Sequence, residues 1–234
     1  MKLFKNIKNW LENQEHLFYL FLFILIVPNL VLCLTEPLPL MAKVCNVLLP
    51  FGCYYLLMTL SRNCGKMLWI LFLFLFFGAF QIVLLYLFGQ SIIAVDMFLN
   101  LVTTNSSEAL ELLDNLTPAI IAVIVLYVPS LILGTISIVR KRKLTAEFIR
   151  RERKRASIVF GISLLSLVGA YVQDPGYELK SDLYPLNVCY NVGLAFQRTA
   201  LTQNYHRTSK DFTFHALPTH CLLYTSPSPR DMRR

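Results

Sequence analysis

The sequence predicts an all-α integral membrane protein with five transmembrane helices followed by a periplasmic linker. Hydrophobic residues make up 56% of its 234 residues, and the mean hydropathy of +0.54 is too high for an ordinary soluble domain. Five apolar segments are long enough to cross a bilayer as helices. Of the 22 Lys and Arg residues, 14 lie in three clusters beside these segments, where basic residues orient helices. The formal charge of +8 therefore does not indicate a nucleic-acid partner.

The first three spans are predicted at Leu17–Leu34, Leu40–Leu60 and Met67–Gly89. Pro28 should kink the first span, and the prolines at 37 and 39 should end it, because proline lacks an amide donor and clashes with the preceding turn. The third span is the clearest, with 23 residues in which Gln81 is the one strongly polar side chain.

The fourth and fifth spans are predicted at Pro118–Val139 and Ala156–Val172. Proline suits a first helical turn, where its missing amide would have no partner. The stretch Arg140–Arg155 between these spans holds nine basic residues against two Glu, which is typical of a cytoplasmic anchor facing anionic lipid. Because all the basic clusters fall on one side, we expect a cytoplasmic amino terminus, with loop 90–117 and everything after residue 172 in the periplasm.

Residues 173–220 differ from the membrane domain, residues 1–172, in composition. Asp174-Pro175-Gly176 predicts a turn, after which Tyr, Asn and charged residues become more frequent. An interfacial helix is expected within Asn187–Leu201. His206 and His215 have no partner at metal-ligand spacing, so no metal site is assigned to the chain. The cysteines form no recognisable disulfide framework.

Loop 90–117 carries four acidic residues and no Lys or Arg. On a continuous helix, Asn100, Thr104 and Glu108 would fall within about 80° of one face along about 12 Å. A carboxylate beside neutral hydrogen-bonding groups suits a zwitterionic head group, which contains an ammonium and a phosphodiester. Alternatively, Asn105 and Glu108 have the spacing of a capping box that starts a short amphipathic helix. The spacing alone leaves both interpretations open.

This run resembles the periplasmic loop of the bacterial lipid A phosphoethanolamine transferases, the family that includes the mobile colistin-resistance enzymes associated with polymyxin resistance. The stretch Tyr184–His215 also resembles their linker from membrane to catalytic domain. The resemblance implies transfer of phosphoethanolamine from phosphatidylethanolamine to lipid A in the Gram-negative inner (plasma) membrane. It further implies that Asn100, Thr104 and Glu108 bind the donor substrate.

The same family resembles alkaline phosphatases and sulfatases in having an α/β catalytic domain with a zinc-bound threonine, introduced by Gly-Glu-Thr. No Gly-Glu-Thr occurs here, so no catalytic residue is assigned and the chain itself is expected to be inactive. Residues 221–234 resemble the translation of a sequencing adapter, which implies a truncated reading frame that lacks the catalytic domain. Two alternatives stay open: a membrane-anchored sulfatase-like or lipoteichoic-acid-synthase-like enzyme, and a non-enzymatic membrane transporter.

Overall fold

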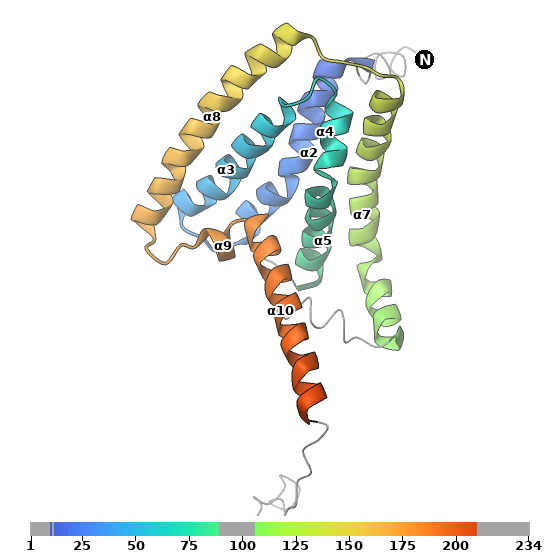
Figure 1. Cartoon of the computed structure of the whole chain (residues 1–234), viewed down its shortest axis with the longest axis vertical. Coiled ribbons are helices and arrows are strands. Elements are labelled where there is room, and N and C mark those ends of the chain that lie inside the picture. Colours follow the sequence, from blue (N-terminus) through green and yellow to red (C-terminus); the bar gives the residue numbers. More distant parts are fainter. Residues whose placement is uncertain (1–9, 11, 89–105, 210–234) are drawn as a thin grey trace, which may run out of the picture. The chain divides into compact units, whose positions relative to one another are not determined.

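The computed structural model describes residues 10, 12–88 and 106–209, and all regular structure within these residues is helical (Figure 1). The labelled helices are α2 (Gln14–Thr35), α3 (Leu40–Met58), α4 (Cys64–Ile70), α5 (Phe72–Phe88), α7 (Ser106–Val139), α8 (Ala146–Gln173), α9 (Leu179–Asp182) and α10 (Leu186–Ser209). The chain divides into two compact units, Met1–Ala195 and Phe196–Arg234. All packing described below lies within the first unit.

Four helices are long and apolar enough to cross a membrane: α2, α3, α8 and the part of α7 from Leu116 to Val139. A fifth crossing is present if α4 and α5 count as one span, since they are joined at a bend of 63°. The structure therefore confirms an all-α, multi-pass membrane fold with four, or up to five, candidate spans. No strand occurs in the described parts of the chain.

Helix α2 lies at the centre of the bundle and contacts α3, α4, α5 and α7. It begins after Asn13, whose side chain accepts a 2.9 Å hydrogen bond from the Glu15 amide, and it ends shortly before Pro37. Its buried residues point in several directions, as expected of a helix with neighbours on more than one side. Helix α3 lies between α2 and α8, while α4 and α5 lie between α2 and α7 (Figure 1).

The expected third span is bent instead of straight. It starts at Cys64, capped by the side chain of Asn63, and breaks at Leu71, where no proline or glycine is present. A side chain on Gly65 would lie 2.2 Å from the Gly134 carbonyl oxygen, so α4 rests directly on the backbone of α7.

Helices α7 and α8 extend beyond their predicted spans. Helix α7 continues from Ser106 through Pro118, which was expected in the first turn of a separate helix. The carbonyl that loses its partner there lies at residue 114, in a polar stretch where water can replace the bond. Helix α8 begins at Ala146, with the Thr145 hydroxyl accepting from the Phe148 amide, so ten of the 16 residues of the basic stretch lie in α8.

The basic segments gather at one end of the bundle, which we call the basic end (residues 59–66 and 140–155 with Glu12). The Leu144 amide donates to the Arg62 carbonyl at 2.7 Å. The Asn63 amide group donates to the Arg142 carbonyl at 2.9 Å, and Arg142 in turn donates to the Glu12 carbonyl at 3.0 Å. The sequence placed these segments on one side of the membrane, and the fold brings them into contact.

Candidate functional site

Of the three residues predicted to bind a head group, the structure describes Glu108 alone. Asn100 and Thr104 lie outside the described residues, and so does Asn105 of the alternative capping box. Glu108 lies in the first described turn of α7, where the backbone is helical. It precedes Val139 by 31 residues, which is about 46 Å of helix at about 1.5 Å per residue.

That length exceeds the roughly 30 Å of a bilayer's hydrocarbon core. With Val139 at the membrane boundary of the basic end, Glu108 lies outside the hydrocarbon on the opposite side. In that arrangement the backbone would bring Glu108 to the level of the lipid head groups, on the side away from the basic clusters.

A cap segment, residues 174–189, closes the end of the bundle opposite the basic end. It begins with the predicted turn: the Gly176 amide donates to the Asp174 carboxylate at 2.9 Å, and the Tyr177 amide donates to the Asp174 carbonyl at 3.1 Å. Because the cap segment packs on the bundle, the first compact unit extends to Ala195, beyond the boundary expected at residue 172.

Two buried asparagines join the cap segment to α2 and α3. Pro50 has no amide hydrogen, so the Asn46 carbonyl one turn earlier has no helical donor. The Asn29 side-chain amide donates to this carbonyl at 2.9 Å and to the Tyr184 carbonyl at 2.8 Å. The Asn46 side chain donates to the Asp182 carbonyl at 2.6 Å. The Asn46 carbonyl, which has no helical donor because of Pro50, and the carbonyls of the irregular cap segment thus accept hydrogen bonds from side chains. Backbone groups in a membrane protein need such partners, because lipid offers none.

Two tyrosines of the cap segment reach into the bundle. The Tyr177 hydroxyl donates to the side-chain oxygen of Asn46, and the Tyr184 hydroxyl donates to the Phe74 carbonyl at 2.9 Å. Both rings are almost fully buried. Burial raises the pKa of Tyr177, which keeps its phenol protonated and able to donate. The cap segment is therefore anchored at several points along α3 and α5.

These anchoring residues were missed by the sequence analysis. Asn29 directly follows Pro28, and Asn46 precedes Pro50 by one helical turn. An asparagine next to, or one turn before, a proline in an apolar span is a readable signal, because proline frees a carbonyl that an amide side chain can satisfy.

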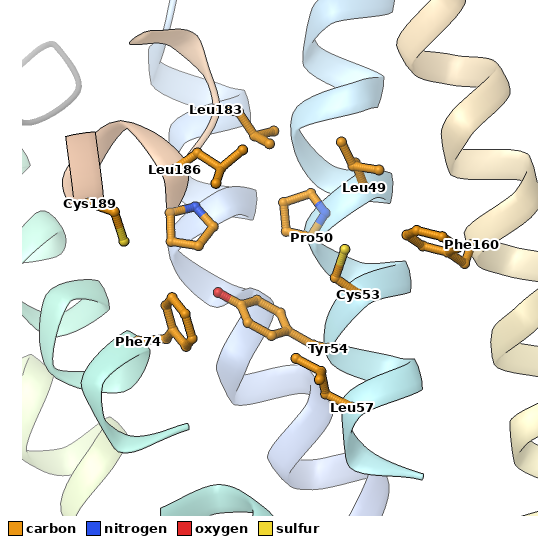
Figure 2. A pocket seen from close by; sticks show the side chains of 11 residues that line it. Leu49, Pro50, Cys53, Tyr54, Leu57, Phe74, Phe160, Leu183, Leu186 and Cys189 are labelled. Atoms are coloured by element: carbon orange, nitrogen blue, oxygen red, sulfur yellow. The ribbon is translucent and has the colours of Figure 1, made fainter. Parts of the chain in front are cut away.

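An apolar cavity of about 310 Å³ lies beneath the cap segment (Figure 2). Its walls come from α3, α5, α8 and the residues that open α10. Tyr54 extends across it from α3 toward Phe74. The Tyr54 hydroxyl is buried and has no hydrogen-bond partner among the residues that the structure describes.

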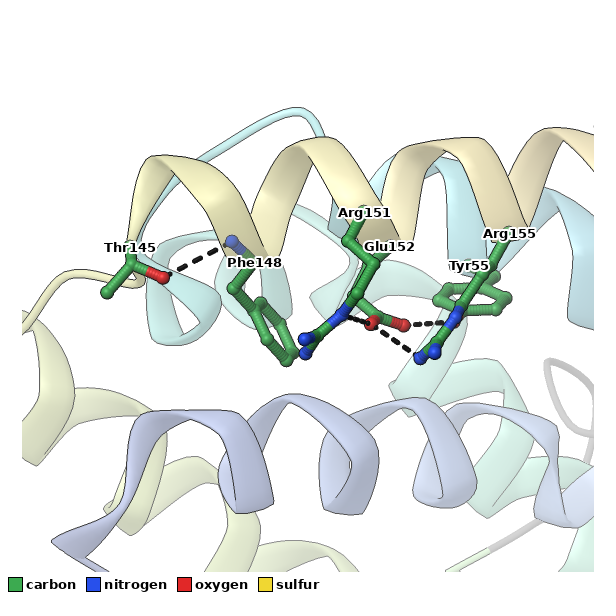
Figure 3. Close-up of polar contacts among 6 residues, drawn as sticks. All are labelled: Tyr55, Thr145, Phe148, Arg151, Glu152 and Arg155. Atoms are coloured by element: carbon green, nitrogen blue, oxygen red, sulfur yellow. Dashed lines mark hydrogen bonds and ion pairs between the residues drawn. The ribbon is translucent and has the colours of Figure 1, made fainter.

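A buried carboxylate lies at the basic end (Figure 3). The Glu152 side chain is 0% exposed. It accepts hydrogen bonds from the Tyr55 hydroxyl, from Arg151 Nε at 3.0 Å and from Arg155 Nη1 at 2.9 Å. Both guanidinium groups are more than half exposed, so the ion pairs link a solvated basic surface to the interface of α8 with α3. The sequence analysis counted Glu152 only as one of two acids in a basic stretch.

Within the described ranges, no group of three or more His, Cys, Asp and Glu side chains could hold a metal ion. Comparison with family models, with curated proteins and with solved structures gives no match to this chain.

Proposed function

We propose that this chain is the membrane domain of a phosphoethanolamine transferase, which takes phosphoethanolamine from phosphatidylethanolamine and passes it to lipid A. One observation carries the proposal. The run containing Asn100, Thr104 and Glu108 resembles the donor-binding loop of that family, and the fold supports placing Glu108 at head-group level, opposite the basic end. Residues 173–220 then serve as the linker that leaves the bundle on the donor side.

The proposal includes five crossings, with the amino terminus in the cytoplasm and residue 173 in the periplasm of a bacterial inner membrane. Glu12 contacts Arg142 at the basic end, whereas the Gln173 side chain accepts from the Met41 amide at the other end. The chain thus enters and leaves the bundle at opposite ends, which requires an odd number of crossings. Counting α4 and α5 as one bent span gives five. The basic end faces the cytoplasm by the positive-inside rule.

In this proposal the chain recognises the donor lipid through complementary polar groups. The Glu108 carboxylate accepts hydrogen bonds from the ammonium, while the Asn100 amide and the Thr104 hydroxyl donate to the phosphodiester. The zinc centre of the family has no counterpart in the described residues, so no step of the reaction is assigned to zinc here.

Head-group selectivity tests the proposal on the chain alone. Phosphatidylcholine carries a quaternary ammonium without N–H donors, so Glu108 should hold phosphatidylethanolamine more tightly. The chain is purified from membranes that contain both lipids, and the lipids that remain bound are quantified by mass spectrometry. We expect several-fold enrichment of phosphatidylethanolamine, which Glu108→Gln abolishes.

Asp114→Asn is the matched control, because it removes the same charge from a position rotated by about 120° around the same helix. It should leave the enrichment unchanged. Equal retention of the two lipids by the unmodified chain would contradict the proposed donor site.

A further inference from the structure

We infer that the cavity beneath the cap segment holds one fatty acyl chain of a bilayer phospholipid, whatever its head group. The inference does not rest on the proposed transferase function. It would hold equally for any other role of this membrane domain, and its test measures no transfer.

The chemistry of the walls selects a hydrocarbon ligand. Leu49, Leu57, Phe74, Phe160 and Leu183 contribute only carbon and hydrogen from their side chains. An alkyl chain that leaves its neighbours for such a surface loses no hydrogen bond. Water would lose hydrogen bonds, because a buried water molecule needs about two to four polar partners.

The volume fits a length of chain. A water molecule occupies about 30 Å³ in the liquid, and a methylene group is of similar size. A cavity of about 310 Å³ therefore has room for about ten methylene groups. That amount is a large part of one lipid tail but far less than a whole phospholipid. The head group and the second tail would therefore remain in the surrounding bilayer.

The cavity lies at a depth where lipid acyl chains surround the bundle. Leu49 lies nine residues from the start of α3, about 14 Å along the helix, and so within the depth of the hydrocarbon core. Among the lining residues, Leu186 is 47% exposed and Cys189 is also exposed, and we call these two the rim, whereas Tyr54 is 3% exposed (Figure 2). A lipid tail beside the bundle would enter at this rim.

Photocrosslinking tests the inference on the full chain. The protein is reconstituted in vesicles of phosphatidylethanolamine and phosphatidylglycerol, each supplied in turn with a diazirine midway along one acyl chain. Adducts are mapped by mass spectrometry. We expect several-fold more adducts per residue at 49–57 and 183–189 than around Val125, which is 67% exposed on α7. The excess should be the same with either head group.

Cys53→Trp should fill the cavity and reduce the excess to the level of the α7 surface. Val125→Trp adds the same ring outside the cavity and should leave the excess unchanged. If circular dichroism shows that Cys53→Trp does not fold, Leu186→Trp at the exposed rim replaces it, with the same expected loss.

Three results would overturn the inference. Adducts in the cavity could be no more frequent than on α7, or could persist when the cavity is filled. They could also depend on the head group. Tyr54→Phe removes the one hydroxyl among the lining side chains without changing the ring. An acyl chain should label this variant as well as the parent, and a several-fold loss would also contradict the inference, because it would mean that the labelled lipid is held through an oxygen atom at Tyr54.

Discussion

Replacing Asn29 by Leu should destabilise the bundle by about 2 kcal/mol. The change keeps a similar volume but removes both donors, which leaves the carbonyls of Asn46 and Tyr184 without partners. Hydrogen bonds between membrane helices contribute about 0.6 kcal/mol on average and up to about 1.7 kcal/mol, so two such bonds give about 1 to 3 kcal/mol. Within the described part of the chain, the Asn29 side-chain oxygen accepts no hydrogen bond, and its removal offsets a small part of this cost.

Pro50 provides a test of the cause. In Pro50→Ala, residue 50 regains an amide that can donate to the Asn46 carbonyl within α3, so one of the two bonds from Asn29 becomes redundant. Asn29→Leu should then cost about 0.5 to 1 kcal/mol less in the Pro50→Ala background than in the parent.

The assay is reversible unfolding in mixed micelles of increasing dodecyl sulfate content, followed by circular dichroism. Ser157→Ala is a control, since it removes only a bond within α8, from the Ser157 hydroxyl to the Arg153 carbonyl. The reasoning would be refuted if Asn29→Leu cost less than about 0.5 kcal/mol, within the scatter of ordinary surface substitutions. The same cost in both backgrounds would refute the role assigned to proline.

Three further predictions concern the two ends of the bundle and its packing. Glu152→Gln should lower the free energy of unfolding by about 1 to 2 kcal/mol, because its ion pairs with Arg151 and Arg155 weaken while the hydrogen bond from Tyr55 survives. The same substitution at the exposed Glu147 should cost almost nothing. Gly65→Ala should lower the melting temperature strongly, since the added carbon would lie 2.2 Å from a backbone oxygen. Gly161→Ala is the control, because its added carbon meets nothing within 4 Å, and it should be neutral or stabilising. Equal effects of the two substitutions on the melting temperature would contradict the close packing of α4 on α7. Alkaline phosphatase fused after residues 105 and 200 should be active and fused after residue 148 inactive, and the opposite pattern would reverse the proposed topology.

The spans could be predicted from the sequence because their signals are local. A run of apolar residues long enough for a bilayer identified α2 and α3, and the prolines at 37 and 39 located the turn between them. The clustering of basic residues predicted that these segments lie on one side of the membrane, and in the fold Arg62 contacts Leu144.

Other features depend on tertiary contacts and were not readable. The break at Leu71 has no proline or glycine to announce it, and on its two sides Gly65 approaches α7 and α5 contacts α2. The burial of Glu152 depends on the position of Tyr55, 97 residues away in sequence. The cap segment looked like the start of a linker because its composition is polar, yet its backbone carbonyls at Tyr184 and Asp182 accept hydrogen bonds from Asn29 and Asn46 inside the bundle.

Transfer activity in a chimera tests the proposed donor site most directly. Residues 1–220 are joined to the catalytic domain of an established phosphoethanolamine transferase, and modified lipid A is measured by mass spectrometry at equal membrane abundance. A hydrogen bond to a charged group contributes about 1.5 to 3 kcal/mol, so Glu108→Gln should reduce transfer at least about tenfold, while Asp114→Asn should not.

If Glu108 instead only caps a helix, its loss should cost about 1 kcal/mol of local stability and leave the chemistry intact. Near-normal transfer by Glu108→Gln, Asn100→Ala and Thr104→Ala in an active chimera would contradict the donor site. Loss of transfer in all three variants, with Asp114→Asn unaffected, is the result that we predict.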